Sequence, residues 1–307
     1  MTVEATEAFP VRTAEEASVR AGGTPGKRES RGWLVRALVL IIALAWTTPT
    51  AGLLISSLRN EVSVSSTGWW TVFVNPFDFT QYTLANYDRV LTAEGLFDAF
   101  VNSLIVTIPA TVIPITLAAF AAYGFAWTKF RGRSFLFAMV VGLLVIPLQM
   151  SLVPLLRVYG SLDLVGSFVG VWLAHTGFGL PLAIYLLYNY ISQLPKDIFE
   201  SAYIDGATPF TAFTRLVLPL SYPALASFAI FQFLWVWNDL LVSLVFLGTG
   251  SEVAPLTVGL ASLVGSRGEA FHLLTAAGFI AMIVPVIVFL SLQRFFVRGL
   301  LAGSVKG

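Results

Sequence analysis

The chain has 307 residues, of which 57% are hydrophobic and only 11% are charged, whereas soluble domains carry about 25% charged residues. This composition is typical of a membrane protein. A net charge of +1, two histidines and no cysteine exclude disulfides and thiolate chemistry, and they argue against a nucleic-acid-binding surface, a metal centre and histidine-based catalysis.

Six uncharged runs are long enough to cross a bilayer, since a membrane-spanning helix needs roughly 20 apolar residues. They are Ala37 to Leu58, Ala99 to Thr128, Ser134 to Leu156, Leu164 to Leu194, Leu216 to Asn238 (continuing past Asp239 to Leu247) and Ala270 to Gln293. The first run is too long for a cleavable signal and no cleavage site follows it, so it should remain as a helix. The sequence therefore predicts an all-α, polytopic membrane protein with six transmembrane helices.

Basic residues set the expected orientation. Of the 18 Lys and Arg residues, 14 lie in the N-terminal segment and in every second gap between the runs. Because Lys and Arg are retained in the cytoplasm, both termini are predicted to be cytoplasmic. The expected organisation is a disordered tail (1–32), a first transmembrane helix (33–58), an external loop (59–98), a five-helix core (99–298) with a cytoplasmic loop at 192–220, and a cytoplasmic tail (299–307).

The N-terminal GGTPGKRES only partly matches a phosphate-binding loop. Ala21 stands where the motif has its first glycine, and Arg28 stands where it has Ser or Thr. No cofactor site is expected on this chain, so any ATP must be bound by another subunit.

The predicted external loop is rich in aromatic residues, which are Trp69, Trp70, Phe73, Phe77, Phe79, Tyr82 and Tyr87. The favoured interpretation is an aromatic belt at the lipid headgroups. The alternative is a docking surface for an external partner.

Two polar groups fall inside apolar runs, where ionisable residues are often functional. Asp239 follows Trp237 and Asn238 near the expected outer end of the fifth helix, where a substrate pathway and simple solvation are both open interpretations. His175 lies deeper in the fourth helix, and an interhelical hydrogen bond is favoured there over a proton relay.

The segment ESAYIDGATPF, which starts at Glu200, and the three residues before it predict a short amphipathic helix. Asp197 can cap its start and Gly206 can end it in a left-handed conformation. Its apolar face should carry Ile198, Phe199, Ala202 and Tyr203, and its acidic face favours a protein partner over a membrane surface. Thr208 and Pro209 then restart a helix, which Pro219 and Pro223 are expected to interrupt.

These residues carry a family resemblance. Glu200, Ser201 and Ala202, then Gly206, then Leu216, Leu218 and Pro219 resemble the "EAA" loop of inner-membrane permeases in ATP-binding-cassette importers. The triplet Asp205, Gly206 and Ala207 is similar to the carbohydrate-specific branch, the maltose-type second permease. Ser201 and Leu216 depart mildly from the commonest Ala and Ile. The resemblance extends from Asn102 to Gly307 and includes WNDLLVSLVFL and the terminal QRFFVRGLLAGSVKG.

The resemblance implies a type I importer permease of the bacterial cell membrane that takes up a di- or oligosaccharide such as an α-glucoside. Its implied partners are a homologous permease, two ATPase subunits that bind ATP and Mg, an external solute-binding protein and the bilayer. The short helix would be the coupling helix, with Glu200, Ser201, Ala202, Tyr203, Asp205, Gly206 and Ala207 facing the ATPase. The implied substrate pathway includes Trp237, Asn238 and Asp239, and the implied ATPase-contacting tail includes Gly303, Ser304 and Lys306.

Two rival functions come from other classes. An ion- or proton-coupled secondary transporter should show internal repeats and several membrane carboxylates, but the only candidate carboxylate is Asp239 and no repeat is visible. An integral membrane enzyme is disfavoured by the absence of cysteine and of clustered His, Asp and Glu.

Overall fold

The structure is a computed structural model that describes residues 26–250, 252–264 and 270–302. The chain divides into two compact units at Gly52 and Leu53. The described part of the first unit is a single helix, and the second unit contains the other helices. The described residues are almost entirely helical, with one isolated antiparallel bridge between Arg59 and Tyr82. This confirms the all-α fold.

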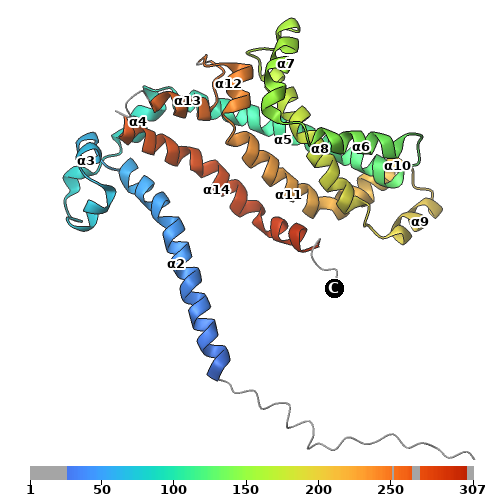
Figure 1. Ribbon diagram of the computed structural model, residues 1–307, viewed down its shortest axis with the longest axis horizontal. Coiled ribbons are helices and arrows are strands. Elements are labelled where there is room, and N and C mark those ends of the chain that lie inside the picture. The colour runs from blue at the N-terminus through green and yellow to red at the C-terminus, as the bar shows by residue number, and fades with distance from the viewer. Residues whose placement is uncertain (1–25, 251, 265–269, 303–307) are drawn as a thin grey trace, which may run out of the picture. The chain divides into compact units, whose positions relative to one another are not determined.

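Figure 1 shows the helices of the described chain. They are α2 (Gly26–Ser57), α3 (Glu61–Ser66), η2 (Trp69–Phe73), η3 (Phe79–Gln81), α4 (Ala85–Thr92), α5 (Leu96–Trp127), α6 (Arg133–Leu143), α7 (Leu148–Ser161), α8 (Phe168–Ile191), α9 (Lys196–Ile204), α10 (Pro209–Ala212), the π-helical turn η4 (Phe213–Val217), α11 (Leu218–Trp237), α12 (Leu241–Leu247), α13 (Leu256–Leu263) and α14 (Phe271–Ala302).

Five helical stretches in this part of the chain are long and apolar enough to cross a membrane, and they are six if a bent pair of helices forms one span. The five are 32–57, 96–127, 168–191, 209–237 and 271–293, close to the predicted runs. The polytopic architecture is therefore confirmed with five to six spans. The orientation of the termini stays a prediction.

The predicted third helix is not straight. It is broken into α6 and α7, which meet at an angle of 102°. Pro147 explains the break: its ring clashes with the carbonyl four residues earlier, at Leu143, and it disfavours helical geometry at Ile146. Helix α6 ends at Leu143, and Pro147 becomes the N-cap of α7.

The opposite holds in the fifth span, where the prediction of an interruption is wrong. Pro219 and Pro223 lie inside a helical stretch that continues to Trp237. The turn before Pro219 is π-helical, and the amide of Leu218 donates to the carbonyl of Phe213. This wider turn is a π-bulge, and bulges of this kind accommodate residues that do not fit the regular helical ladder. The span also ends at Trp237 instead of continuing to Leu247, and α12 is a separate helix.

Both ends of the chain are more helical than predicted. Helix α2 starts at Gly26, within the predicted tail, and α14 continues to Ala302, although its glycines predicted a flexible end. Residues 1–25 and the predicted tail contacts Gly303, Ser304 and Lys306 lie outside the described residues.

Helices α5, α8, α11 and α14 lie side by side and form the centre of the second unit (Figure 1). Tryptophan indoles tie them together across helix boundaries: Trp172 donates to the carbonyl of Ile105, Trp127 to that of Ile191, and Trp237 to that of Ala281. Because a buried N–H without a partner costs free energy in an apolar medium, these bonds fix the register of neighbouring helices.

Candidate functional site

Helix α9 begins without the predicted cap. Pro195 occupies the N-cap position and offers no side-chain hydrogen bond, while Asp197 lies in the first turn. Asp197 therefore stabilises the helix through its charge near the positive end of the helix dipole, and the prediction that it caps the helix is wrong. The cause is Pro195, which takes the N-cap position itself with extended geometry, so that the helix starts two residues earlier than expected.

The other end of α9 confirms the role predicted for glycine. Gly206 has φ +83°, in the left-handed region. The amide of Gly206 donates to the carbonyl of Tyr203 over 3.1 Å, and the amide of Ala207 donates to that of Ala202 over 2.9 Å. These two bonds form a Schellman motif, which satisfies the last carbonyls of the helix and reverses the chain.

The restart after this turn is also confirmed. The hydroxyl of Thr208 accepts a hydrogen bond from the amide of Thr211, and Pro209 occupies the first helical turn of α10. The C-terminal end of α9 is therefore followed by a defined turn that leads directly into α10.

Aromatic contacts attach α9 to the end of α5. The ring of Phe199 is buried and stacks on Trp127 with ring centroids 3.9 Å apart and an interplanar angle of 24°. The hydroxyls of Tyr203 and Tyr123 lie 3.2 Å apart, and Tyr123 also donates to the carbonyl of Pro209. Sequence reasoning missed Trp127 and Tyr123, although their spacing of four residues places both on one face at the end of α5.

The surface of α9 differs from the predicted amphipathic pattern. Phe199 is fully buried and Ala202 is half-buried, but Ile198 and Tyr203 are exposed, and Ile204 is 86% exposed. Among the predicted coupling residues, Glu200, Ser201, Asp205 and Gly206 are exposed and Ala207 is half-buried. The helix thus presents carboxylates next to bare isoleucine side chains, a surface that fits a protein partner better than water.

The residues predicted for a substrate pathway do not form one cluster. Trp237 is buried, with its ring stacked on Phe233 and its indole bonded to α14. Asn238 is exposed and donates to the carbonyl of Leu234 in its own helix. Asp239 accepts hydrogen bonds from the amides of Val242 and Ser243 at the start of α12. Their contribution to transport stays a prediction.

His175 meets Asp239 from the neighbouring helix. Its imidazole is fully buried, packs edge-on against Trp235, and has its Nε2 atom 3.6 Å from Oδ2 of Asp239. This separation exceeds a hydrogen bond, so the predicted interhelical hydrogen bond is replaced by a close polar contact between α8 and the junction of α11 and α12.

The capping role of Asp239 leads to a first prediction. Asp239→Ala should destabilise the purified transporter by about 1 kcal/mol or more, because two amides of α12 lose their acceptor. Asp239→Asn keeps one acceptor and should lose less than half as much, and Asn238→Ala, which removes only a local bond, should have no effect. Thermal unfolding in detergent measures all three. Equal losses for the Ala and Asn variants would show that the charge beside His175 matters more than the cap.

Two residues of α5 that the sequence reasoning missed hold the segment before α13 in place. The side-chain amide of Asn102 donates hydrogen bonds to the carbonyls of Glu252 and Ala254. The hydroxyl of Ser103 accepts a hydrogen bond from the backbone amide of Leu256 over 2.7 Å. A cavity of about 760 Å³ opens beside them, with carboxylates on its lining from Glu94, Asp98 and Glu252. Within the described residues, no group of three or more His, Asp and Glu side chains could hold a metal ion.

A bundle of apolar spans with one short exposed helix fixed at the end of α5 defines a polytopic membrane protein. The chain belongs to the family of binding-protein-dependent transport system inner membrane components, whose model matches residues 18–301. It is therefore a transport protein of the membrane and not an enzyme, as the resemblance implied.

Curated relatives cover nearly the whole chain. The chain is 61% identical over 268 residues to the osmoprotective compounds uptake permease protein GgtD of Synechocystis, covering 87% of this chain and 90% of the relative. It is 44% identical over 380 residues to the alpha-glucoside transport system permease protein AglG of Rhizobium meliloti, covering 92% and 99%. It is 36% identical over 228 residues to the trehalose transport system permease protein SugB of Mycobacterium tuberculosis, and this alignment covers 73% of this chain and 82% of the relative.

A solved structure confirms the fold. A chain from the crystal structure of a bacterial ABC transporter involved in the import of the acidic polysaccharide alginate superimposes with a TM-score of 0.73 at 19% identity, covering 89% of this chain and 99% of that one.

Proposed function

We propose that this chain is a transmembrane permease subunit of an ATP-driven, binding-protein-dependent sugar importer, and that α9 is its coupling helix. In this role α9 transmits closure of an ATPase subunit to the bundle, which alternates between outward and inward access. The observation that carries the proposal is the way α9 is attached to the bundle. The ring of Phe199 packs on Trp127 and Gly206 ends the helix, while the side chains of Glu200 and Ile204 are exposed. A rigid, exposed helix transmits force, whereas a loose loop would absorb it.

The expected substrate is a di- or oligosaccharide such as an α-glucoside. Support comes from the relatives, since AglG is named for alpha-glucosides and SugB for trehalose. GgtD is named for osmoprotective compounds. The expected partners are a homologous permease, two ATPase subunits that carry ATP and Mg, and an external solute-binding protein. A related solved complex contains a periplasmic protein with a bound alginate pentasaccharide, which supports the last of these.

The same proposal assigns Gly303, Ser304 and Lys306 to contacts with the ATPase subunits. Deleting residues 302–307 should weaken ATPase retention during purification or lower coupled ATP hydrolysis, with the spans still inserted. A truncated complex that stays together and transports at the wild-type rate would remove this assignment.

A charge reversal on α9 tests the coupling role. Glu200→Lys should abolish sugar uptake and the ATP hydrolysis stimulated by loaded binding protein, because it places a cation on the face expected to meet the ATPase. Uptake of labelled trehalose and maltose into proteoliposomes, measured together with phosphate release, gives both readouts. Asp88→Lys is the matched control, since Asp88 is also exposed but lies on α4, far along the chain from the coupling segment.

Two results would contradict the proposal. Wild-type coupling in Glu200→Lys would exclude α9 as the coupling helix. Uptake that needs an ion gradient and proceeds without any ATPase subunit would instead establish the rival secondary transporter.

A further inference from the structure

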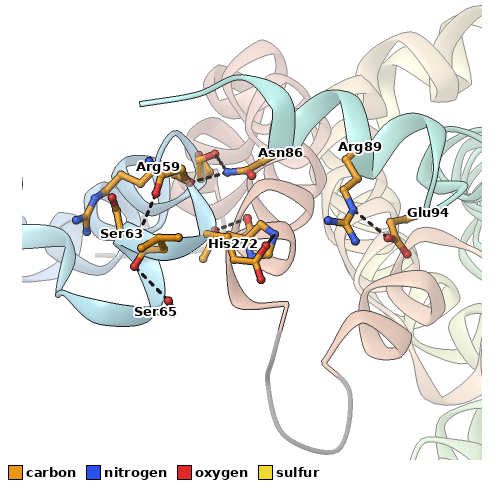
Figure 2. Close-up of polar contacts among 12 residues, drawn as sticks. Arg59, Ser63, Ser65, Asn86, Arg89, Glu94 and His272 are labelled. Carbon is orange, nitrogen blue, oxygen red and sulfur yellow. Dashed lines mark hydrogen bonds and ion pairs between the residues drawn. The ribbon is translucent and has the colours of Figure 1, made fainter. Parts of the chain in front are cut away.

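The segment between Asn60 and Gln81 is folded around a buried arginine. Arg59 directly follows the first membrane span, yet it is only 2% exposed. Its guanidinium donates to the carbonyls of Thr67 and Gly68 and to the hydroxyls of Thr67 and Thr71. Figure 2 shows this guanidinium pointing into the coil of the segment, away from the Asn86 side chain. An arginine at this depth normally reaches lipid phosphates, but here it holds the segment in one shape.

Both ends of this outer segment are tied to the end of α2. The amide of Asn60 donates to the carbonyl of Gln81 over 2.9 Å, and the amide of Thr83 donates to that of Leu58 over 2.7 Å. The side-chain amide of Asn86 adds hydrogen bonds to the carbonyls of Ser57 and Arg59. The segment therefore starts and finishes beside Ser57, where the apolar span ends.

The middle of the segment exposes large apolar side chains and carries no charge. Trp70 is 61% exposed, Phe73 69%, Val74 75% and Phe77 84%. No Asp, Glu, Lys or Arg occurs between Glu61 and Asp78. Exposing a contiguous group of large apolar side chains to water is unfavourable, and aromatic side chains are typical of the layer between headgroups and acyl chains.

Gly68 contributes to the orientation of this surface. A Cβ atom at Gly68 would overlap the indole ring of Trp70, so the ring lies directly on the glycine backbone. Trp69 in turn contacts both Trp70 and Phe73 edge to face. The aromatic rings are therefore held in fixed positions by the fold of the segment.

We propose that residues 60–81 form an interfacial membrane anchor that inserts its aromatic side chains among the lipids of the outer leaflet. The anchor fixes the end of the first span at a constant depth. Lipid is the occupant that fits this surface, because the segment starts and finishes beside the end of an apolar span and its large exposed side chains between Val62 and Phe77 are aromatic or aliphatic. The polar side chains exposed among them, which are Ser65, Ser66, Thr67 and Asn75, are all uncharged, and aromatic residues without charges are typical of the membrane interface.

The absence of native cysteine makes a direct test possible. Val74→Cys, labelled with an environment-sensitive fluorophore, is placed in the assembled transporter in nanodiscs that contain headgroup-attached nitroxide lipids. The fluorescence should shift to the blue and be largely quenched by these lipids. Thr92→Cys, an exposed position on α4, is the control and should show neither change. Adding Phe73→Ser and Phe77→Ser to the Val74→Cys chain should restore a water-like spectrum.

Two outcomes would overturn the proposal. A Val74 probe that is unquenched in lipid, and shifts only when the external binding protein is added, would identify the surface as a protein-docking site. A probe that remains water-exposed in both conditions would show that the aromatic surface has no lipid contact.

Discussion

Phe199→Ala should abolish coupled transport while leaving the spans inserted. The buried ring stacks on Trp127 and is the main apolar contact that fixes α9 to α5. Truncating a buried Phe to Ala costs about 3–5 kcal/mol, and a helix of nine residues cannot hold its shape alone. Helix α9 should therefore detach locally. The expected readout is loss of sugar uptake and of stimulated ATP hydrolysis in proteoliposomes, with a normal yield of membrane-inserted protein.

The conservative variant separates anchoring from general damage. Phe199→Leu keeps an apolar side chain in the same space and should retain most of the coupled ATP hydrolysis. Ile204→Ala should leave attachment intact, because Ile204 is exposed, and it should affect only ATPase contact. Wild-type coupling in Phe199→Ala would show that α9 transmits no force through this contact.

Gly206→Val should also cause a large loss of coupled transport. No atom lies within 4 Å of a Cβ built at Gly206, so the effect comes only from the backbone. Its φ of +83° costs an L-residue roughly 1–2 kcal/mol, and more when it is β-branched. The turn should open, the two Schellman bonds should break, and uptake and stimulated ATP hydrolysis should fall together.

Two variants make this result specific. Gly206→Asn should recover much of the activity, because asparagine tolerates the left-handed region. Gly132→Val imposes comparable strain at φ +82° before α6, outside the coupling segment, and should leave stimulated ATP hydrolysis higher than Gly206→Val does. If both valine variants lose coupling equally, general strain and not the end of α9 is responsible.

The sequence alone determined the features that depend on local composition. Apolar runs of membrane length predicted the spans, because a helix of this length satisfies its own backbone hydrogen bonds in lipid. Gly206, Thr208 and Pro209 predicted the end of one helix and the start of the next, since a positive φ, an N-cap oxygen and a fixed φ act within a few residues. The resemblance in the Glu200 segment predicted the family that the comparisons then showed.

Only the tertiary structure decided what depends on distant neighbours. Pro147 breaks a helix whereas Pro219 and Pro223 do not, because a π-helical turn precedes Pro219 and the surrounding helices hold the span together. Phe199 is buried and Ile204 exposed because Trp127, more than 70 residues earlier, supplies the packing surface. Arg59 turns inward for a similar reason: the carbonyls that accept its hydrogen bonds become available only when the outer segment folds back on the end of the first span.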